Sequence, residues 1–219
     1  MPKSKDIRPC QSRWLWLSDS SMLPAPYHCL VIVGSVRPNR VGPQIAEWVR
    51  QIGTQTISGT VEVVDIRDYA LPLDSEPGVP AAGRGYVHSG TEKWSEKVAT
   101  GDMVVFVSPQ YNWGYPAALK NAIDHLYHEW KGKPAVIVTY GGHGGGKCAT
   151  QLRQVLEGLD MRVAATMPGL RLPRETILAN TGTIDAASEF HEARPLVEQS
   201  FTEMEALLRP TDPVDGQRG

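Results

Sequence analysis

The stretch VVFVSPQYNWGYPAALKNAIDHL, residues 104–126, decides the fold of this chain. Its first four residues, Val104–Val107, form a short apolar run rich in β-branched side chains, which is typical of a strand buried on both faces. After a loop that begins at Ser108, a helix pattern starts at Tyr115, with apolar residues at three- and four-residue steps. The loop between them carries amide and aromatic side chains. Open α/β sheets bind ligands where a strand ends in such a loop ahead of a helix, so we expect a ligand-binding edge here.

Composition bounds the class of protein. The chain has 219 residues, enough for one domain with a substantial core, and a net charge of −2 that favours neither nucleic acid nor a membrane surface as a partner. No segment approaches the roughly 20 apolar residues that a membrane span needs. Cys10, Cys29 and Cys148 have no metal-binding spacing, which indicates reduced thiols. We therefore expect a cytoplasmic protein without nucleic-acid or membrane partners.

Three segments differ in composition. Residues 1–26 hold prolines and serines around one apolar run, Trp14–Leu17, which is too short for a signal-peptide core. A transit peptide is the minor alternative to an extension of unknown role that lies on the domain or on a partner subunit. We predict a single domain at 27–208 and a flexible tail at 209–219.

Strand and helix patterns alternate along that domain. Besides 104–107, apolar runs predict strands at residues 27–33, 61–66, 134–140 and 161–167. Helix patterns, in addition to the one after Tyr115, lie at 41–52 with Gly53 as its stop, at 91–100, at 149–159 and at 190–208 with a start or kink at Pro195. Five strands alternating with helices imply an α/β fold, a parallel sheet with helices on both faces.

The first strand leads into GSVRPNR, residues 34–40, directly before a helix. A helix start with free amides, a hydroxyl and two guanidinium groups favours an anion, and Arg37 and Arg40 could each bind phosphate oxygens with two donors. The alternative is that both arginines are solvated loop residues. The turn lacks the GxGxxG fingerprint of dinucleotide binding.

The fourth strand leads into GGHGGGKC, residues 141–148. This nearly matches the phosphate-loop pattern GxxxxGK[ST], but Cys148 stands where a hydroxyl would bind Mg²⁺, which argues against a nucleotide hydrolase. The second interpretation is that Gly141 and Gly142 let main-chain amides approach a flat ligand. The third is a purely structural turn.

Few side chains suggest catalysis of their own. His125 and His128 lie three residues apart without further metal ligands, so we expect surface or interface roles for both, and only His143 falls near the ligand edge. No GxSxG motif and no marked carboxylate pair occurs, so any catalysis would rest on a bound cofactor.

Three segments, GSVRPNRVGPQIAEWV, SPQYNWGYPAALKNAIDHL and TYGGHGGGKCA, resemble the signature segments of the NADPH-dependent FMN reductase family, and the likeness covers about residues 28–165. These are flavodoxin-like quinone, azo-dye and flavin reductases that work as dimers or tetramers. The resemblance implies a three-layer sandwich whose five-stranded parallel sheet has the order 2-1-3-4-5, with FMN at the switch point between strands one and three.

The resemblance also implies the site. The FMN phosphate would be held by Ser35, Arg37, Arg40 and Val41. The ring system would lie against Pro109, Gln110, Tyr111, Asn112 and Trp113, and at its other edge against Tyr140, Gly141, Gly142 and His143. NADPH would reduce FMN by hydride transfer, and FMN would reduce a quinone, flavin or related acceptor by two electrons in a ping-pong cycle, without an obligatory catalytic side chain. Many members have Ser and Glu at the positions of Arg40 and Gln110.

Two alternatives stay open: a flavodoxin-type electron carrier and a redox-switched interaction module. Carriers usually hold the phosphate in a Ser/Thr/Gly loop and show an acidic face, so the arginines and the near-zero charge favour the enzyme. Tyr115, Tyr127 and Trp130 add aromatic area beyond the core stripe of the helix, so we expect a homodimer or homotetramer built partly on it.

Overall fold

A computed structural model of the chain describes residues 26–73, 76–83 and 85–208. The predicted extension, except Pro26, and the predicted tail at 209–219 lie outside the described residues.

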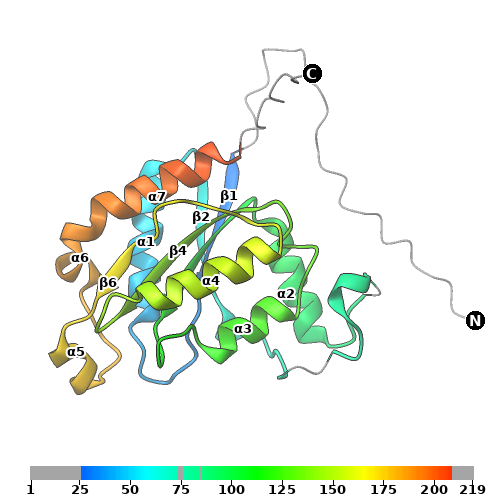
Figure 1. Cartoon of the computed structure of the whole chain (residues 1–219), viewed down its shortest axis with the longest axis horizontal. Coiled ribbons are helices and arrows are strands. Elements are labelled where there is room, and N and C mark those ends of the chain that lie inside the picture. Colours follow the sequence, from blue (N-terminus) through cyan, green and yellow to red (C-terminus); the bar gives the residue numbers. More distant parts are fainter. Residues whose placement is uncertain (1–25, 74–75, 84, 209–219) are drawn as a thin grey trace, which may run out of the picture.

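The fold is built on a parallel sheet (Figure 1). Its strands are β1 (Tyr27–Val33), β2 (Gly59–Asp65), β3 (Met103–Pro109), β4 (Pro134–Gly141), β5 (Arg162–Val163) and β6 (Gly169–Arg171). The order is β2-β1-β3-β4-β5, and β6 also pairs with β4. The predicted order 2-1-3-4-5 is therefore confirmed.

The fifth position of the sheet differs from the predicted strand at 161–167, because two short strands fill it. Between them the backbone N–H of Thr166 donates to the carboxylate of Glu203, 2.7 Å away, and not to a neighbouring strand. Pro168 has no N–H to donate and contributes only its carbonyl, which accepts from the N–H of Thr139 at 2.9 Å. The chain leaves the sheet edge at these residues.

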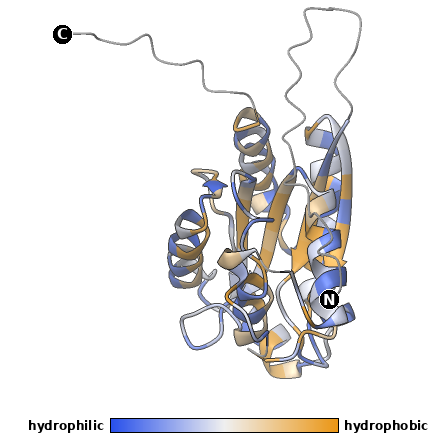
Figure 2. Cartoon of the chain, turned by 90° about the vertical axis from the view of Figure 1, so that its right-hand side faces the viewer, coloured by the Kyte–Doolittle hydropathy of each residue, from blue (hydrophilic) through white to orange (hydrophobic). Residues whose placement is uncertain are grey.

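Alternating side chains of the strands fill two separate cores. Val31 and Val33 of β1 face one side of the sheet, and Leu30 and Ile32 face the other. Helices α1 (Gly42–Thr56), α6 (Ala186–Glu189) and α7 (Arg194–Ala206) cover the first side. Helices α2 (Ser89–Thr100), α3 (Ala117–Asp124) and α4 (Gly146–Gly158) cover the second. Figure 2 shows the hydrophobic sheet between helices with hydrophilic outer faces.

Helix boundaries correct one prediction and confirm another. Gly53 does not stop α1, which continues to Thr56. A Cβ atom at Gly53 would stand 2.5 Å from the ring of Phe201, so this glycine admits the phenyl ring of α7. The last helix begins at Arg194, so the predicted start at Pro195 is confirmed to within one residue.

Two residues predicted at the surface or an interface are buried, and those predictions are wrong. The ring of His125 contacts the hydroxyl of Thr91 at 3.0 Å and the carbonyl of Pro72 at 2.7 Å. Trp130 is fully buried, and its indole N–H donates to the carbonyl of Ile123 at 3.0 Å. The segment between β2 and α2 reaches His125 through Pro72, and Trp130 packs against the rings of Trp94 and Phe106. A helical pattern alone does not reveal either contact.

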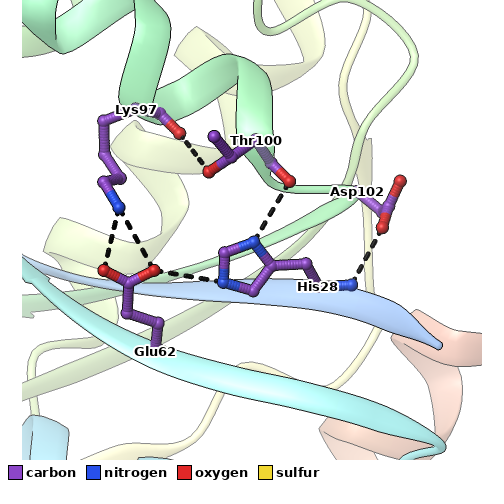
Figure 3. A network of polar contacts seen from close by, with 5 residues as sticks. All are labelled: His28, Glu62, Lys97, Thr100 and Asp102. Atoms are coloured by element: carbon purple, nitrogen blue, oxygen red, sulfur yellow. Dashed lines mark hydrogen bonds and ion pairs between the residues drawn. The ribbon is translucent and has the colours of Figure 1, made fainter.

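A polar network fixes the amino-terminal end of the sheet (Figure 3). The ring of His28 lies between the carbonyl of Thr100 and the carboxylate of Glu62, 3.1 Å from each. Lys97 of α2 donates to the same carboxylate at 2.9 Å, and the backbone N–H of His28 donates to Asp102 at 2.8 Å. These contacts tie β1, β2 and α2 together at the edge opposite the carboxyl ends of the strands.

Candidate functional site

The loops at the carboxyl ends of β1, β3 and β4 meet at one edge of the sheet. The hydroxyl of Tyr140, at the end of β4, donates to the hydroxyl of Ser35, just after β1, at 3.4 Å. The guanidinium carbon of Arg37 lies 3.6 Å from the ring centroid of Tyr111, in the loop after β3. Loops that are far apart in the chain therefore converge, as the sequence predicted.

The loop after β3 turns tightly between Tyr111 and Gly114. The N–H of Tyr111 donates to the carbonyl of Gly114 at 2.8 Å, and the reverse bond measures 3.0 Å. The two residues between them, Asn112 and Trp113, have φ angles of 47° and 72°, in the left-handed region. Such a conformation costs about 1–3 kcal/mol for a residue with a bulky side chain, so the rest of the site must impose it.

That turn presents an indole to the loop after β4. Trp113 is 50% exposed, and its ring stacks on His143 with centroids 5.3 Å apart and planes 16° apart. The ammonium of Lys147 lies 4.2 Å from the same ring centroid, a cation–π distance. The indole thus joins the loop after β3 to the loop after β4.

The start of α1 is open to an anion. Val41 occupies the N-cap without a capping side chain, and the first turn has no acidic residue. Amide donors at such a helix start favour a negative group, and the buried hydroxyl of Ser35 lies beside them. A Cβ atom at Gly42 would stand 2.7 Å from the hydroxyl oxygens of both Ser35 and Tyr140, so only glycine fits there.

The two arginines of the first loop differ in their surroundings. Arg40 donates to both carboxylate oxygens of Asp65, at 2.9 and 2.5 Å, and also to the carbonyl of Ser35. Its side chain is 9% exposed. Arg37 is exposed, and no carboxylate among the described residues forms an ion pair with it. Sequence reasoning missed Asp65, although an acidic residue at the end of β2 was a signal.

Gln110 acts on the neighbouring helix. Its side-chain oxygen accepts from the backbone N–H of Cys148 at 3.2 Å, in the first turn of α4, which has no cap of its own. The thiol of Cys148 is buried, and this burial raises its pKa. With Cys148 in the core and Lys147 over an indole, this turn does not have the arrangement of a nucleotide-hydrolysing phosphate loop.

One further element borders the site, and sequence reasoning missed it. Helix α5 (Arg174–Ala179) places the Cδ1 atom of Ile177 3.3 Å from where a Cβ atom of Gly142 would stand. Ile177 is 46% exposed and Leu178 is 70% exposed. The irregular sequence between β6 and α6 gave no signal of this helix.

Comparison with known proteins identifies the family. The sequence profile of the NADPH-dependent FMN reductase family matches residues 28–168. The chain belongs to this family. It is 50% identical over 180 residues to an NAD(P)H-dependent FMN reductase of Schizosaccharomyces pombe, covering 82% of this chain and 89% of the relative. It is 32% identical over 142 residues to a quinone reductase of Escherichia coli, covering 61% and 71%.

A solved structure shares the fold. The flavoenzyme NAD(P)H:acceptor oxidoreductase FerB of Paracoccus denitrificans superposes with a TM-score of 0.63 at 19% identity, covering 82% of this chain and 98% of FerB. This FMN reductase family member is accordingly an FMN-dependent NAD(P)H oxidoreductase on a flavodoxin-like fold, as the sequence predicted.

The residues of this FMN reductase fit its cofactor. An uncapped helix start beside Ser35 and Arg37 suits a phosphate dianion. The exposed indole of Trp113 and the backbone of Gly141, whose φ is 155°, suit the approach of a flat ring.

The described residues hold neither a cluster of metal-binding side chains nor a membrane-spanning helix. They contain no group of three or more His, Cys, Asp or Glu side chains that could hold a metal ion. No helix among them is long and apolar enough to cross a membrane.

Proposed function

We propose that this FMN reductase passes electrons from NAD(P)H to quinones, flavins or related small acceptors in a two-electron, ping-pong reaction. The observation that carries the proposal is the contact of Tyr140 with Ser35 and of Arg37 with Tyr111, which gathers three loops at one edge of the sheet. FMN, when bound, supplies the group that accepts hydride and passes it on. The chain supplies binding, orientation and electrostatics.

The phosphate of FMN would lie at the start of α1. Ser35 offers a hydroxyl, and Val41 and its successors offer amides. Arg37 and Arg40 offer guanidinium groups, and that of Arg40 is paired with Asp65. The side chain of Val41 packs against the core, so its part would be played by the backbone.

The ring system would lie between the loops after β3 and β4. Proposed to border it are Pro109, Gln110, Tyr111, Asn112 and Trp113 on one side and Tyr140, Gly141, Gly142 and His143 on the other. Of these, Gln110 would act through α4, whose first turn its side chain caps. Backbone amides of the glycine turn would stabilise negative charge on the reduced ring.

The family and both relatives named above are reductases, which favours the enzyme over the electron carrier and the redox-switched module.

The test is a turnover assay on the purified, flavin-loaded protein. We expect a yellow protein that, without oxygen, oxidises about one equivalent of NADPH or NADH alone and turns over repeatedly only when a quinone or free flavin is present, with parallel lines in a two-substrate plot. Arg37→Ala/Arg40→Ala should lose FMN. The control is Arg50→Ala, which removes an arginine of α1 paired with Glu47. A colourless protein that ignores added FMN, or a flavoprotein inert towards NAD(P)H, contradicts the proposal.

We also propose a homodimer or homotetramer. Exposed Val36, Ile177 and Leu178 support it, since large exposed apolar side chains near a functional edge are common at interfaces. Sedimentation equilibrium at micromolar concentration tests it, and a monomer contradicts it. A cytoplasmic location is proposed from the free thiols of Cys29 and Cys148, and fractionation of cells that express the protein tests it.

A further inference from the structure

The ion pair between Arg40 and Asp65 joins two strand ends across the proposed phosphate loop. Arg40 lies in the loop after β1, and Asp65 is the last residue of β2, which pairs with β1. The guanidinium meets the carboxylate with two parallel bonds of 2.9 and 2.5 Å, the strongest geometry available to such a pair. The side chains are only 9% and 20% exposed, so solvent screens the pair poorly.

Arg40 uses the same side chain to shape the loop. One of its nitrogens also donates to the carbonyl of Ser35, so the guanidinium spans the turn from its first residues to its last. A Cβ atom at Gly182, which adopts a φ of 75°, would stand 3.0 Å from the backbone nitrogen of Arg40. Arg40 therefore holds the loop from inside, and the segment before α6 lies close against its outer side.

Arg37 has the opposite character. It is exposed, it forms no ion pair with a described carboxylate, and its guanidinium carbon lies over the ring of Tyr111, 3.6 Å from the centroid. Stacking on an aromatic face fixes the orientation of a guanidinium and leaves its charge uncompensated. Of the two positive charges in this loop, Asp65 cancels that of Arg40 and leaves that of Arg37.

We propose that Asp65 is a positioning residue: it neutralises the charge of Arg40 and fixes the side chain with which Arg40 shapes the loop. Arg37 alone then provides the positive charge that selects FMN over riboflavin. The proposal rests on the proposed function, since it assigns roles within the same phosphate site. It separates two arginines that the loop sequence presents as equivalent.

The experiment compares the dissociation constants of riboflavin and FMN for the apoprotein, because the two ligands differ only in the phosphate. The readout is the dissociation constant of riboflavin divided by that of FMN, so a larger ratio means stronger selection for FMN. Arg37→Gln should lower it by about 10- to 100-fold, as expected for one charge-assisted bond. Asp65→Asn should raise it, because the charge of Arg40 is then uncovered.

The double variant Arg40→Gln/Asp65→Asn decides between the roles. Arg40→Gln alone leaves the Asp65 carboxylate unpaired near the phosphate, so the ratio should fall by repulsion. Adding Asp65→Asn should return it to within about threefold of the parent value, because the net charge is restored. This charge-neutral variant also guards against unfolding of a single variant, which leaves a buried charge without its partner.

Several outcomes overturn the proposal. If the double variant stays as low as Arg37→Gln, Arg40 itself binds the phosphate. If Asp65→Asn leaves the ratio unchanged or lowers it, Asp65 has a merely structural role or none. Glu47→Gln, which removes the partner of Arg50 on α1, should leave the ratio unchanged. Failure of the proposed function looks different, since the parent protein would then bind neither flavin.

Discussion

The hydroxyl groups of Tyr140 and Ser35 lie 3.4 Å apart, although β3 separates their strands in the sheet. Burial of Tyr140 raises the pKa of its phenol, so the hydroxyl stays protonated and donates. The contact closes the base of the site over the carboxyl end of β3.

Gly42→Ala should break this arrangement. The added methyl group would stand 2.7 Å from both hydroxyl oxygens, nearer than real Cβ contacts come. We expect a loss of about 1–3 kcal/mol in the free energy of unfolding and weaker FMN binding, measured by urea denaturation and flavin titration. Gly146→Ala is the matched control, because that Cβ position in the first turn of α4 has nothing within 4 Å. Normal flavin affinity in Gly42→Ala would show that the contact is dispensable.

Trp113→Gly should separate stability from function. Glycine tolerates the φ of 72° at this position, so the substitution relieves backbone strain of about 1 kcal/mol and leaves stability unchanged or higher. It also removes the indole that faces His143 and Lys147, so kcat/KM for a quinone should fall. Asn180→Gly, at the exposed end of α5 with a φ of 46°, should relieve strain without that loss. If kcat/KM for the quinone is unchanged in Trp113→Gly, the indole has no role in the reaction.

His125→Leu should destabilise the fold although it lies outside the site. The change removes the imidazole from the buried hydroxyl of Thr91 and from the carbonyl of Pro72. Thr91 still bonds Glu76 and Pro72 still accepts from Asn121, so we expect the cost of two lost hydrogen bonds, about 1–3 kcal/mol. His128→Leu, three residues along and exposed, should change stability by no more than about 0.5 kcal/mol. Equal effects in urea unfolding would contradict the buried role of His125.

Glu203→Gln should change the dependence of stability on pH. Burial alone would raise the pKa of Glu203, but hydrogen bonds from the N–H and hydroxyl of Thr166 outweigh it and lower the pKa. A lowered folded-state pKa stabilises the protein above the unfolded-state value, about 4.3, and this gain is lost as the pH falls through the folded-state value.

The parent protein should therefore be more stable than Glu203→Gln at pH 7, and the difference should be smaller at pH 4, below the unfolded-state value of about 4.3. Urea unfolding at both pH values measures it, with exposed Glu192→Gln as the control. A difference that keeps its full size at the lower pH would assign the effect to packing.

Much of the fold follows from local patterns. Apolar runs such as Tyr27–Val33 become strands wherever they fall in a parallel sheet, because both of their faces must be buried. The position of the site follows as well, since parallel strands bring their carboxyl ends to one edge. The fifth strand was not predictable in this way, because Glu203 draws the N–H of Thr166 out of the sheet.

The partners of individual side chains follow no local rule. Arg37 and Arg40 are equivalent in a loop sequence, and the difference between them comes from Asp65, which lies 25 residues beyond Arg40 in the chain. The burial of His125 likewise depends on the carbonyl of Pro72, 53 residues before it. Contacts between residues so far apart in the chain leave no repeating pattern in the sequence from which they could be predicted.

By itself, the sequence determined most strands and helices and the edge where the loops meet, and the resemblance of three segments to a known family supplied the strand order and the cofactor. Backbone conformation and the pattern of hydrophobic burial depend largely on neighbours within a few residues, so strands, helices and their shared edge can be predicted from the sequence. Only the tertiary structure decided which charges are cancelled and which remain free, because electrostatic pairing depends on distance in space.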